Sequence, residues 1–306
     1  MRRTYTEAEH SIRLNRAKRN VISLIKYLII ITVAFFMLYP LLWMMGASFS
    51  EDLLTSFSFL PEHFSLSGWR EALRAPGWGS ATGYSLLRAL WNTMQYVIPE
   101  VLFMTFSTLL VAYVVARFHF KGKKIVFALI IATLLMPATV FRIPMFVFWT
   151  TEPFASLWEG SKIPFMPFFP LWAGGLFAIN SFSVFMYIQF FRSIPRDLDE
   201  AAYIDGANKF QVLFYVLMPI LKPIVITVAL LLFISSFNDY QGPLIYRGDT
   251  DTYPLSLVLP MLSKDSTNTY AHVFSRSIVG VALPIIIFFS AQKYFVGNDA
   301  DTAIKG

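Results

Sequence analysis

Few side chains in this sequence are placed to carry out covalent chemistry. The chain has no cysteine, which removes thiolate nucleophiles, disulfides and cysteine-ligated metals. Its four histidines are scattered and show no metal-binding spacing: His10, His63, His119 and His272. One cluster of acids remains, Asp197, Asp199 and Glu200. It lacks the histidine or second acid cluster that a metal site or carboxylate pair would need, so we expect no catalytic residue and no bound metal.

That acid cluster has the features of a helix start. It follows Pro195, and carboxylates in the first turn favour the positive end of the helix dipole and supply caps. Apolar residues then recur at helical spacing, and we expect them to form one apolar face: Leu198, Ala201, Ala202 and Ile204. The small alanines would let another backbone approach closely. The pattern predicts a short amphipathic helix.

Gly206 can take a positive φ and end this helix in a sharp turn. A second helix is expected to resume near Asn208 and to be broken at Pro219 and Pro223. Two interpretations of residues 192–223 follow from the pattern alone. The short helix is either a docking surface for a partner protein or one arm of a hairpin packed on its own bundle.

Three ionisable residues, Glu100, Arg142 and Asp239, lie in or beside long apolar runs. Such residues are costly in a membrane and often mark a functional path. The alternative for Arg142 is that it extends to the membrane interface or pairs with Glu100. Asn238 and Asp239 form either part of a gate or a simple interfacial cap.

The composition indicates that these residues belong to a membrane protein. Of the 306 residues, 56% are hydrophobic and 14% are charged, against about 25% charged in soluble domains. This excludes a soluble enzyme, a disordered tail and a fibrous repeat, and it argues against nucleic-acid binding. Six runs are long and apolar enough to span a bilayer, which predicts an all-α, six-helix polytopic protein. The runs are 27–50, 89–116, 125–149, 163–191, 220–237 and 277–292.

The basic residues predict the orientation. Seventeen of the 25 lysines and arginines lie in the segments before run one, between runs two and three, between runs four and five, and after run six. The positive-inside rule places both termini in the cytoplasm. The predicted organisation is a basic tail (1–26), a first span (27–50), an outer segment (51–88), a five-helix core (89–296) containing the loop 192–223, and a second cytoplasmic tail (297–306).

The loop 192–223 resembles the signature loop of ABC importer permeases. Glu200-Ala201-Ala202 is followed after three residues by Gly206, and after nine more by Val216-Leu217-Met218-Pro219. Other segments are similar to the sugar-importing branch, and to its smaller, maltose-type permease in particular. They read LYPLLWMMGASF, WNTMQYV, ARFHFKGKK, FFRSIPRDLDEAAYIDGA, SFNDYQGPLI, YPLSLVL and QKYFV.

The resemblance implies a type I ABC importer permease fold in a bacterial inner membrane, with membrane lipid around it. It implies a second homologous permease, two cytoplasmic ATPase subunits that bind ATP and Mg²⁺, an extracytoplasmic solute-binding protein and a sugar substrate. This chain has no phosphate-binding loop of its own. The loop would then carry a coupling helix that docks on an ATPase subunit. The residues assigned to that docking are Glu200, Ala201, Ala202, Asp205, Gly206 and Pro219.

The same resemblance makes Arg142, Asn238 and Asp239 candidates for the path of the sugar. Arg142 could contact sugar hydroxyls or the carboxylate of an acidic sugar. The competing classes are an ion-driven secondary transporter, an integral-membrane transferase and a non-transporting membrane scaffold. Copurification of an ATPase would separate the importer from all three.

Overall fold

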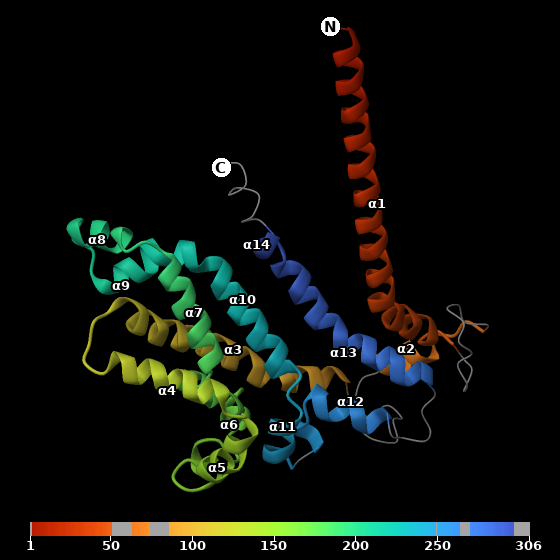
Figure 1. The fold of residues 1–306 in the computed structure, drawn as a ribbon. Helices are drawn as coiled ribbons and strands as arrows, with labels where there is room; N and C mark the ends of the chain where they lie inside the picture. Colours follow the sequence, from red (N-terminus) through yellow and green to blue (C-terminus); the bar gives the residue numbers. More distant parts are fainter. Residues whose placement is uncertain (1, 51–62, 74–85, 249, 264–269, 297–306) are drawn as a thin grey trace. The chain divides into compact units, whose positions relative to one another are not determined.

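The chain folds into helices, as its computed structural model shows (Figure 1). Within the residues that this structure describes, no β-strand forms, and one isolated antiparallel bridge joins Ser50 to Phe64. The all-α fold class predicted from the apolar runs is therefore confirmed. The described residues are 2–50, 63–73, 86–248, 250–263 and 270–296.

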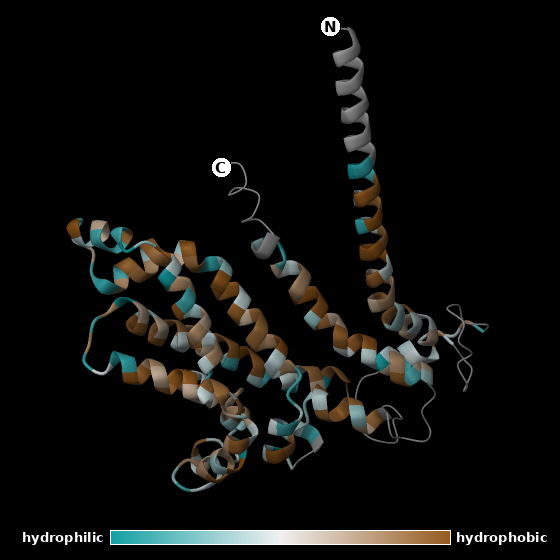
Figure 2. Ribbon diagram, viewed as in Figure 1, coloured by the Kyte–Doolittle hydropathy of each residue, from teal (hydrophilic) through white to brown (hydrophobic). Residues whose placement is uncertain are grey.

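The smaller of two compact units comprises Met1–Ala72 with Ser266–Ile278. Its main element is helix α1 (Arg2–Ala47), of which Lys18–Ala47 is long and apolar enough to cross a membrane. None of its most apolar 18-residue stretch is buried, and Figure 2 shows this part of the helix largely brown. An apolar helix that its own chain does not bury must face lipid or another protein.

Helix α2 (Ser67–Ala72) packs closely on the first turns of α13 (Tyr270–Ala291) within the same unit. A Cβ atom on Gly68 would lie 2.6 Å from the carbonyl oxygen of Ala271, so only glycine fits there. Most of the predicted outer segment, residues 51–62 and 74–85, and the tail 297–306 lie outside the described residues.

The larger unit, Leu73–Asp265 with Val279–Gly306, is organised around helix α3 (Leu86–Arg117). Helices α7 (Ser181–Ser193) and α10 (Met218–Phe237) pack along it. One apolar cluster surrounds the carboxyl-terminal half of α3 and includes Leu109, Tyr187, Phe191 and Leu217. A second cluster surrounds its amino-terminal half and includes Tyr96, Phe168, Phe237 and Leu255.

The third apolar run, predicted as one span from Ile125 to Trp149, is instead bent by 103°. Helix α4 (Lys123–Leu135) ends before Pro137, and α5 (Thr139–Thr150) begins after it. Met136, the residue before that proline, is extended (φ −83°, ψ 133°), the conformation that a following proline favours. Five other helical segments are long and apolar enough to span, so the described residues hold six if this pair counts as one.

The fourth run is also irregular. It begins with the short turns η2 (Met166–Phe168), α6 (Phe169–Trp172) and η3 (Ala173–Phe177) before α7 starts. The glycine pair Gly174-Gly175 lets this segment lie on α3, because a Cβ on Gly175 would approach the backbone of Glu100 and Met104 to 3.1 Å. The hydroxyl of Ser107 donates to the Gly175 carbonyl at 2.6 Å.

The predicted break at Pro219 and Pro223 is wrong, since α10 runs through both prolines without interruption. The irregular turn lies earlier, in the π-helical segment η4 (Val212–Leu217), which directly follows α9 (Lys209–Gln211). Pro219 is the second residue of α10, directly after this π-helical segment. The remaining elements are η1 (Ala155–Leu157), α8 (Asp197–Ile204), α11 (Gln241–Tyr246), η5 (Thr250–Thr252), α12 (Leu255–Ser263) and α14 (Lys293–Val296).

Candidate functional site

The short helix predicted in the loop 192–223 is present as α8, and Gly206 ends it as expected. Gly206 has φ 84°, and a Cβ there would meet no atom within 4 Å, so the need for glycine is conformational. The amide of Gly206 donates to the Tyr203 carbonyl at 3.1 Å and that of Ala207 to the Ala202 carbonyl at 2.9 Å. These two bonds make a complete Schellman motif, which fixes the turn direction after α8.

The chain resumes its helix at Asn208, also as predicted, through a capping box. The Asn208 side chain accepts from the Gln211 amide at 3.0 Å, and the Gln211 side chain accepts from the Asn208 amide at 2.7 Å. The reciprocal partner Gln211 was not predicted, although the spacing Asn-x-x-Gln is a capping-box signal. Both ends of the turn are thus fixed locally.

The expected acidic caps do not form, because Arg196 occupies the N-cap position and no side chain bonds to the first-turn amides. Asp199 turns inward instead, and its Oδ2 lies 3.0 Å from Nε of Arg117 on α3. The two side chains are 11% and 6% exposed. Burial raises the pKa of the Asp199 carboxyl above its usual value, and the nearby Arg117 and Arg196 oppose that rise.

The last turns of α3 contact the loop at three places. Arg117 donates through Nη1 to the Ile194 carbonyl at 3.2 Å, before α8, and meets Asp199 within it. Tyr113 donates its hydroxyl to the Lys209 carbonyl at 2.9 Å, after α8. These contacts fix the position of α8 relative to the end of α3.

The predicted single apolar face of α8 is divided between two sides. Ala202 is buried in the apolar cluster around α3, on the same side as Asp199. Ile204 is 87% exposed, and Glu200 and Ala201 are exposed beside it. Together with Asp197, these residues have the spacing i, i+3, i+4, i+7 of one helix face, and all four are exposed among the residues that the structure describes. Asp205 and Pro219 are exposed as well.

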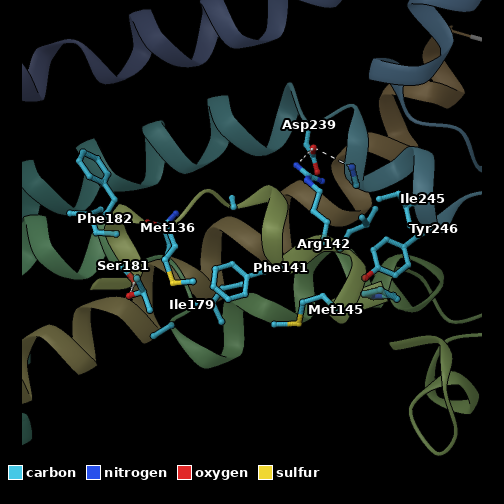
Figure 3. A pocket seen from close by; sticks show the side chains of 18 residues that line it. Met136, Phe141, Arg142, Met145, Ile179, Ser181, Phe182, Asp239, Ile245 and Tyr246 are labelled. Atoms are coloured by element: carbon cyan, nitrogen blue, oxygen red, sulfur yellow. Dashed lines mark hydrogen bonds and ion pairs between the residues drawn. The ribbon is translucent and has the colours of Figure 1, made fainter. Parts of the chain in front are cut away.

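A second candidate site is a pocket of about 620 Å³ at the bend between α4 and α5 (Figure 3). Helix α6, the start of α7 and helix α11 complete its walls. Thr133, Asn180, Ser181 and Tyr246 supply neutral polar groups, and Phe141 supplies an aromatic face. These polar residues were not predicted as part of a site, although Asn180 and Ser181 are polar residues in a run without charge.

Arg142 and Asp239 meet in this pocket. Arg142 Nη2 lies 3.1 Å from Asp239 Oδ1, and the Gly242 amide donates to the same oxygen at 3.2 Å. The alternative pairing of Arg142 with Glu100 is wrong, because Arg142 pairs with Asp239, whereas Glu100 accepts from the Ser236 hydroxyl. The structure therefore brings two of the three predicted path residues together.

Asn238, the third predicted path residue, is not part of the pocket. It is the C-cap of α10, and its side-chain amide donates to the Ile234 carbonyl at 2.8 Å. This contact is a local helix cap of the kind that the interfacial-cap interpretation expected.

The chain belongs to a family of membrane transport proteins. The model of the family described as "Binding-protein-dependent transport system inner membrane component" matches residues 108–296, more than half of the chain. This match includes α8, its turn at Gly206 and the whole pocket between α4 and α11. The protein is therefore a multi-pass inner-membrane component of a transport system, a transport subunit and not an enzyme.

Several curated relatives resemble most of its length. The galactooligosaccharides transport system permease protein GanQ of Bacillus subtilis is 28% identical over 95% of this chain and 98% of its own. The maltose/maltodextrin transport system permease protein MalG of Vibrio vulnificus is 28% identical over 88% and 91%.

A solved structure has the same fold. It is a bacterial ABC transporter involved in the import of the acidic polysaccharide alginate, with a TM-score of 0.71 over 90% of this chain and 97% of that chain. The identity is 21%, so this likeness concerns the fold alone.

Proposed function

We propose that this chain is a permease subunit of an ATP-driven importer that moves a sugar across the bacterial inner membrane by alternating access. A solute-binding protein delivers the sugar, a second homologous permease forms the other half of the pathway, and two ATPase subunits bind ATP and Mg²⁺. The named relatives that transport oligosaccharides support sugar as the substrate class.

The observation that carries this proposal is the exposed face of α8. Its residues Glu200, Ala201 and Ile204 point away from the larger unit's core, while Asp199 and Ala202 anchor the opposite side. A short helix anchored on one face and uncovered on the other suits docking on an ATPase subunit. Because α3 holds the loop before, within and after α8, a movement of the docked helix would pass to α3 as a rigid-body motion.

The test is copurification of the ATPase with the chain, expressed together with its partner subunits. Gly206→Asp and Ala201→Asp should each abolish coelution and sugar-stimulated ATP hydrolysis, while the chain still inserts in the membrane. Gly122→Asp is the matched control, because Gly122 has φ 86° and equally open surroundings in another loop. The variants at Gly206 and Gly122 then carry the same local backbone strain.

Full transport by either loop variant would contradict the docking role. An equal loss of coelution and of ATP hydrolysis in Gly122→Asp would show that backbone strain, rather than the place of the substitution, is responsible. Absence of any ATPase from the wild-type preparation would contradict the importer itself and favour the ion-driven or enzymatic classes.

A further inference from the structure

The pocket at the bend between α4 and α5 is electrically balanced. Of the 18 residues that line it, Arg142 and Asp239 alone carry charge, and they form an ion pair. Their side chains are 31% and 29% exposed, so both remain accessible from the pocket. A ligand therefore meets a paired cation and anion, with no excess of either.

Asp239 is held in place from two sides. Arg142 and the Gly242 amide both contact its Oδ1, which leaves the acceptor capacity of Oδ2 available. A side chain at position 242 would collide with Oδ2, so glycine provides the room for the carboxylate. The carboxylate consequently has one fixed position, from which it repels any second anion.

Arg142 has hydrogen-bonding capacity left over. Its Nη2 contacts Asp239 and its side chain is 31% exposed, whereas its Nε is buried and has no hydrogen-bond partner among the described residues. A sugar hydroxyl could accept from the guanidinium and donate to the free side of the carboxylate, because a hydroxyl does both. An ionised sugar carboxylate can only accept, and it would lie against Asp239.

The remaining walls suit a sugar ring. The hydroxyls of Thr133 and Ser181 lie 2.7 Å apart, and Asn180 uses its oxygen to cap α7, which leaves its NH₂ group as a donor. Phe141 and Tyr246 add aromatic surface on the side toward Arg142 (Figure 3). Neutral polar groups and aromatic faces thus surround one ion pair.

We propose that this pocket is a sugar subsite contributed by this chain, and that Asp239 makes it select uncharged sugars over acidic ones. The inference rests on the proposed function and names the substrate class more narrowly. Asp239 compensates the charge of Arg142 that would otherwise attract a carboxylate, and it offers an acceptor to hydroxyl groups. It is a specificity-determining residue by contact with the ligand.

Equilibrium dialysis of the full chain with its coeluting subunits in lipid nanodiscs tests the proposal. The probes are three neutral tetrasaccharides, of glucose, galactose and arabinose, and one acidic tetrasaccharide, tetragalacturonate. We expect wild type to bind at least one neutral probe about tenfold or more tightly than the acidic one, the difference that one hydrogen bond to a charged group makes.

Asp239→Asn keeps the shape of the side chain and removes its charge. It should tighten binding of tetragalacturonate about tenfold or more, since Arg142 is then free to pair with it. The double variant Arg142→Gln/Asp239→Asn restores neutrality and should lose that gain. The matched control is Asp251→Asn, which makes the same change in an exposed ion pair with Arg88, away from the pocket, and should leave the ratio unchanged.

A wild-type preference for the acidic probe would overturn the proposal, and so would an unchanged ratio in Asp239→Asn. If a variant fails to accumulate, the ratio of neutral to acidic probe affinity in the wild type is enough to decide. Binding of no probe would overturn the subsite, whereas the copurification experiment judges the importer function independently.

Discussion

Two arginine–aspartate pairs in the larger unit have similar atom-to-atom distances and different surroundings. Arg117 and Asp199, which join α3 to α8, are 6% and 11% exposed and lie 3.0 Å apart. Arg142 and Asp239, at the pocket, are 31% and 29% exposed and lie 3.1 Å apart. We call Arg117–Asp199 the closed pair and Arg142–Asp239 the open pair. The closed pair can only join two helices, whereas the open pair can also contact a ligand.

The two pairs are also expected to differ in how much they contribute to the stability of the fold. A buried ion pair contributes little net stability because both charges lose water, yet removal of one partner leaves a buried charge alone. A partly exposed pair is closer to a surface pair, which contributes about 0–1 kcal/mol, and water can replace a lost partner. The first pair is therefore expected to matter for stability and for coupling, and the second for what the protein binds.

The largest stability effect is expected at the closed pair. Asp199→Ala should lower the free energy of unfolding in detergent by about 3–5 kcal/mol, because Arg117 stays buried without its partner. Asp197→Ala, at an exposed position two residues away, should change it by less than about 0.5 kcal/mol. Equal effects in the two variants would contradict the assignment of Asp199 as a joint.

Replacement of both Arg117 and Asp199 tests whether their charges are needed for stability. Arg117→Met combined with Asp199→Leu should recover most of the stability lost in Asp199→Ala, because apolar side chains of similar size can replace a buried pair. Denaturant unfolding in detergent measures the recovery. If the double variant is as unstable as Asp199→Ala, the charges themselves are required.

A smaller effect is expected at the turn after α8. Asn208→Ala removes one half of the capping box and should cost about 1 kcal/mol. Asn208→Ser keeps a capping oxygen and should recover most of that loss. Hydrogen exchange of the amides in α9 measures both, and unchanged protection in Asn208→Ala would show that tertiary packing alone holds the turn.

The smallest stability effect is expected at the open pair. Arg142→Gln should change the free energy of unfolding by less than about 1 kcal/mol, since Asp239 can regain water. The same variant should greatly reduce sugar uptake in reconstituted vesicles, because the pocket loses its guanidinium. If Arg142→Gln strongly destabilised the protein but left sugar uptake normal, the open pair would serve stability rather than binding.

The sequence predicted features that depend on near neighbours. The end of α8 at Gly206 and the new start at Asn208 follow from residue types within one turn. The six apolar runs follow from composition in the same way. Local signals of this kind need no knowledge of the fold.

Features that depend on distant partners were missed or wrong. Asp199 was expected to cap its own helix, but Arg117, 82 residues earlier in the chain, binds it instead. Arg142 pairs with Asp239, and the sequence predicts both as candidates for the path of the sugar without linking the two. The bend at Pro137 was also missed, because proline is tolerated within membrane helices when neighbours satisfy the freed carbonyls.

That bend has a consequence for hydration. Helices α4 and α5 contain 13 and 12 residues, so each is about 20 Å long or less and shorter than a hydrocarbon core of about 30 Å. Backbone carbonyl groups freed at the break after α4 cannot be left facing lipid, so protein or water must cover them. Where water covers them, a solute in the pocket beside the bend can keep part of its hydration shell.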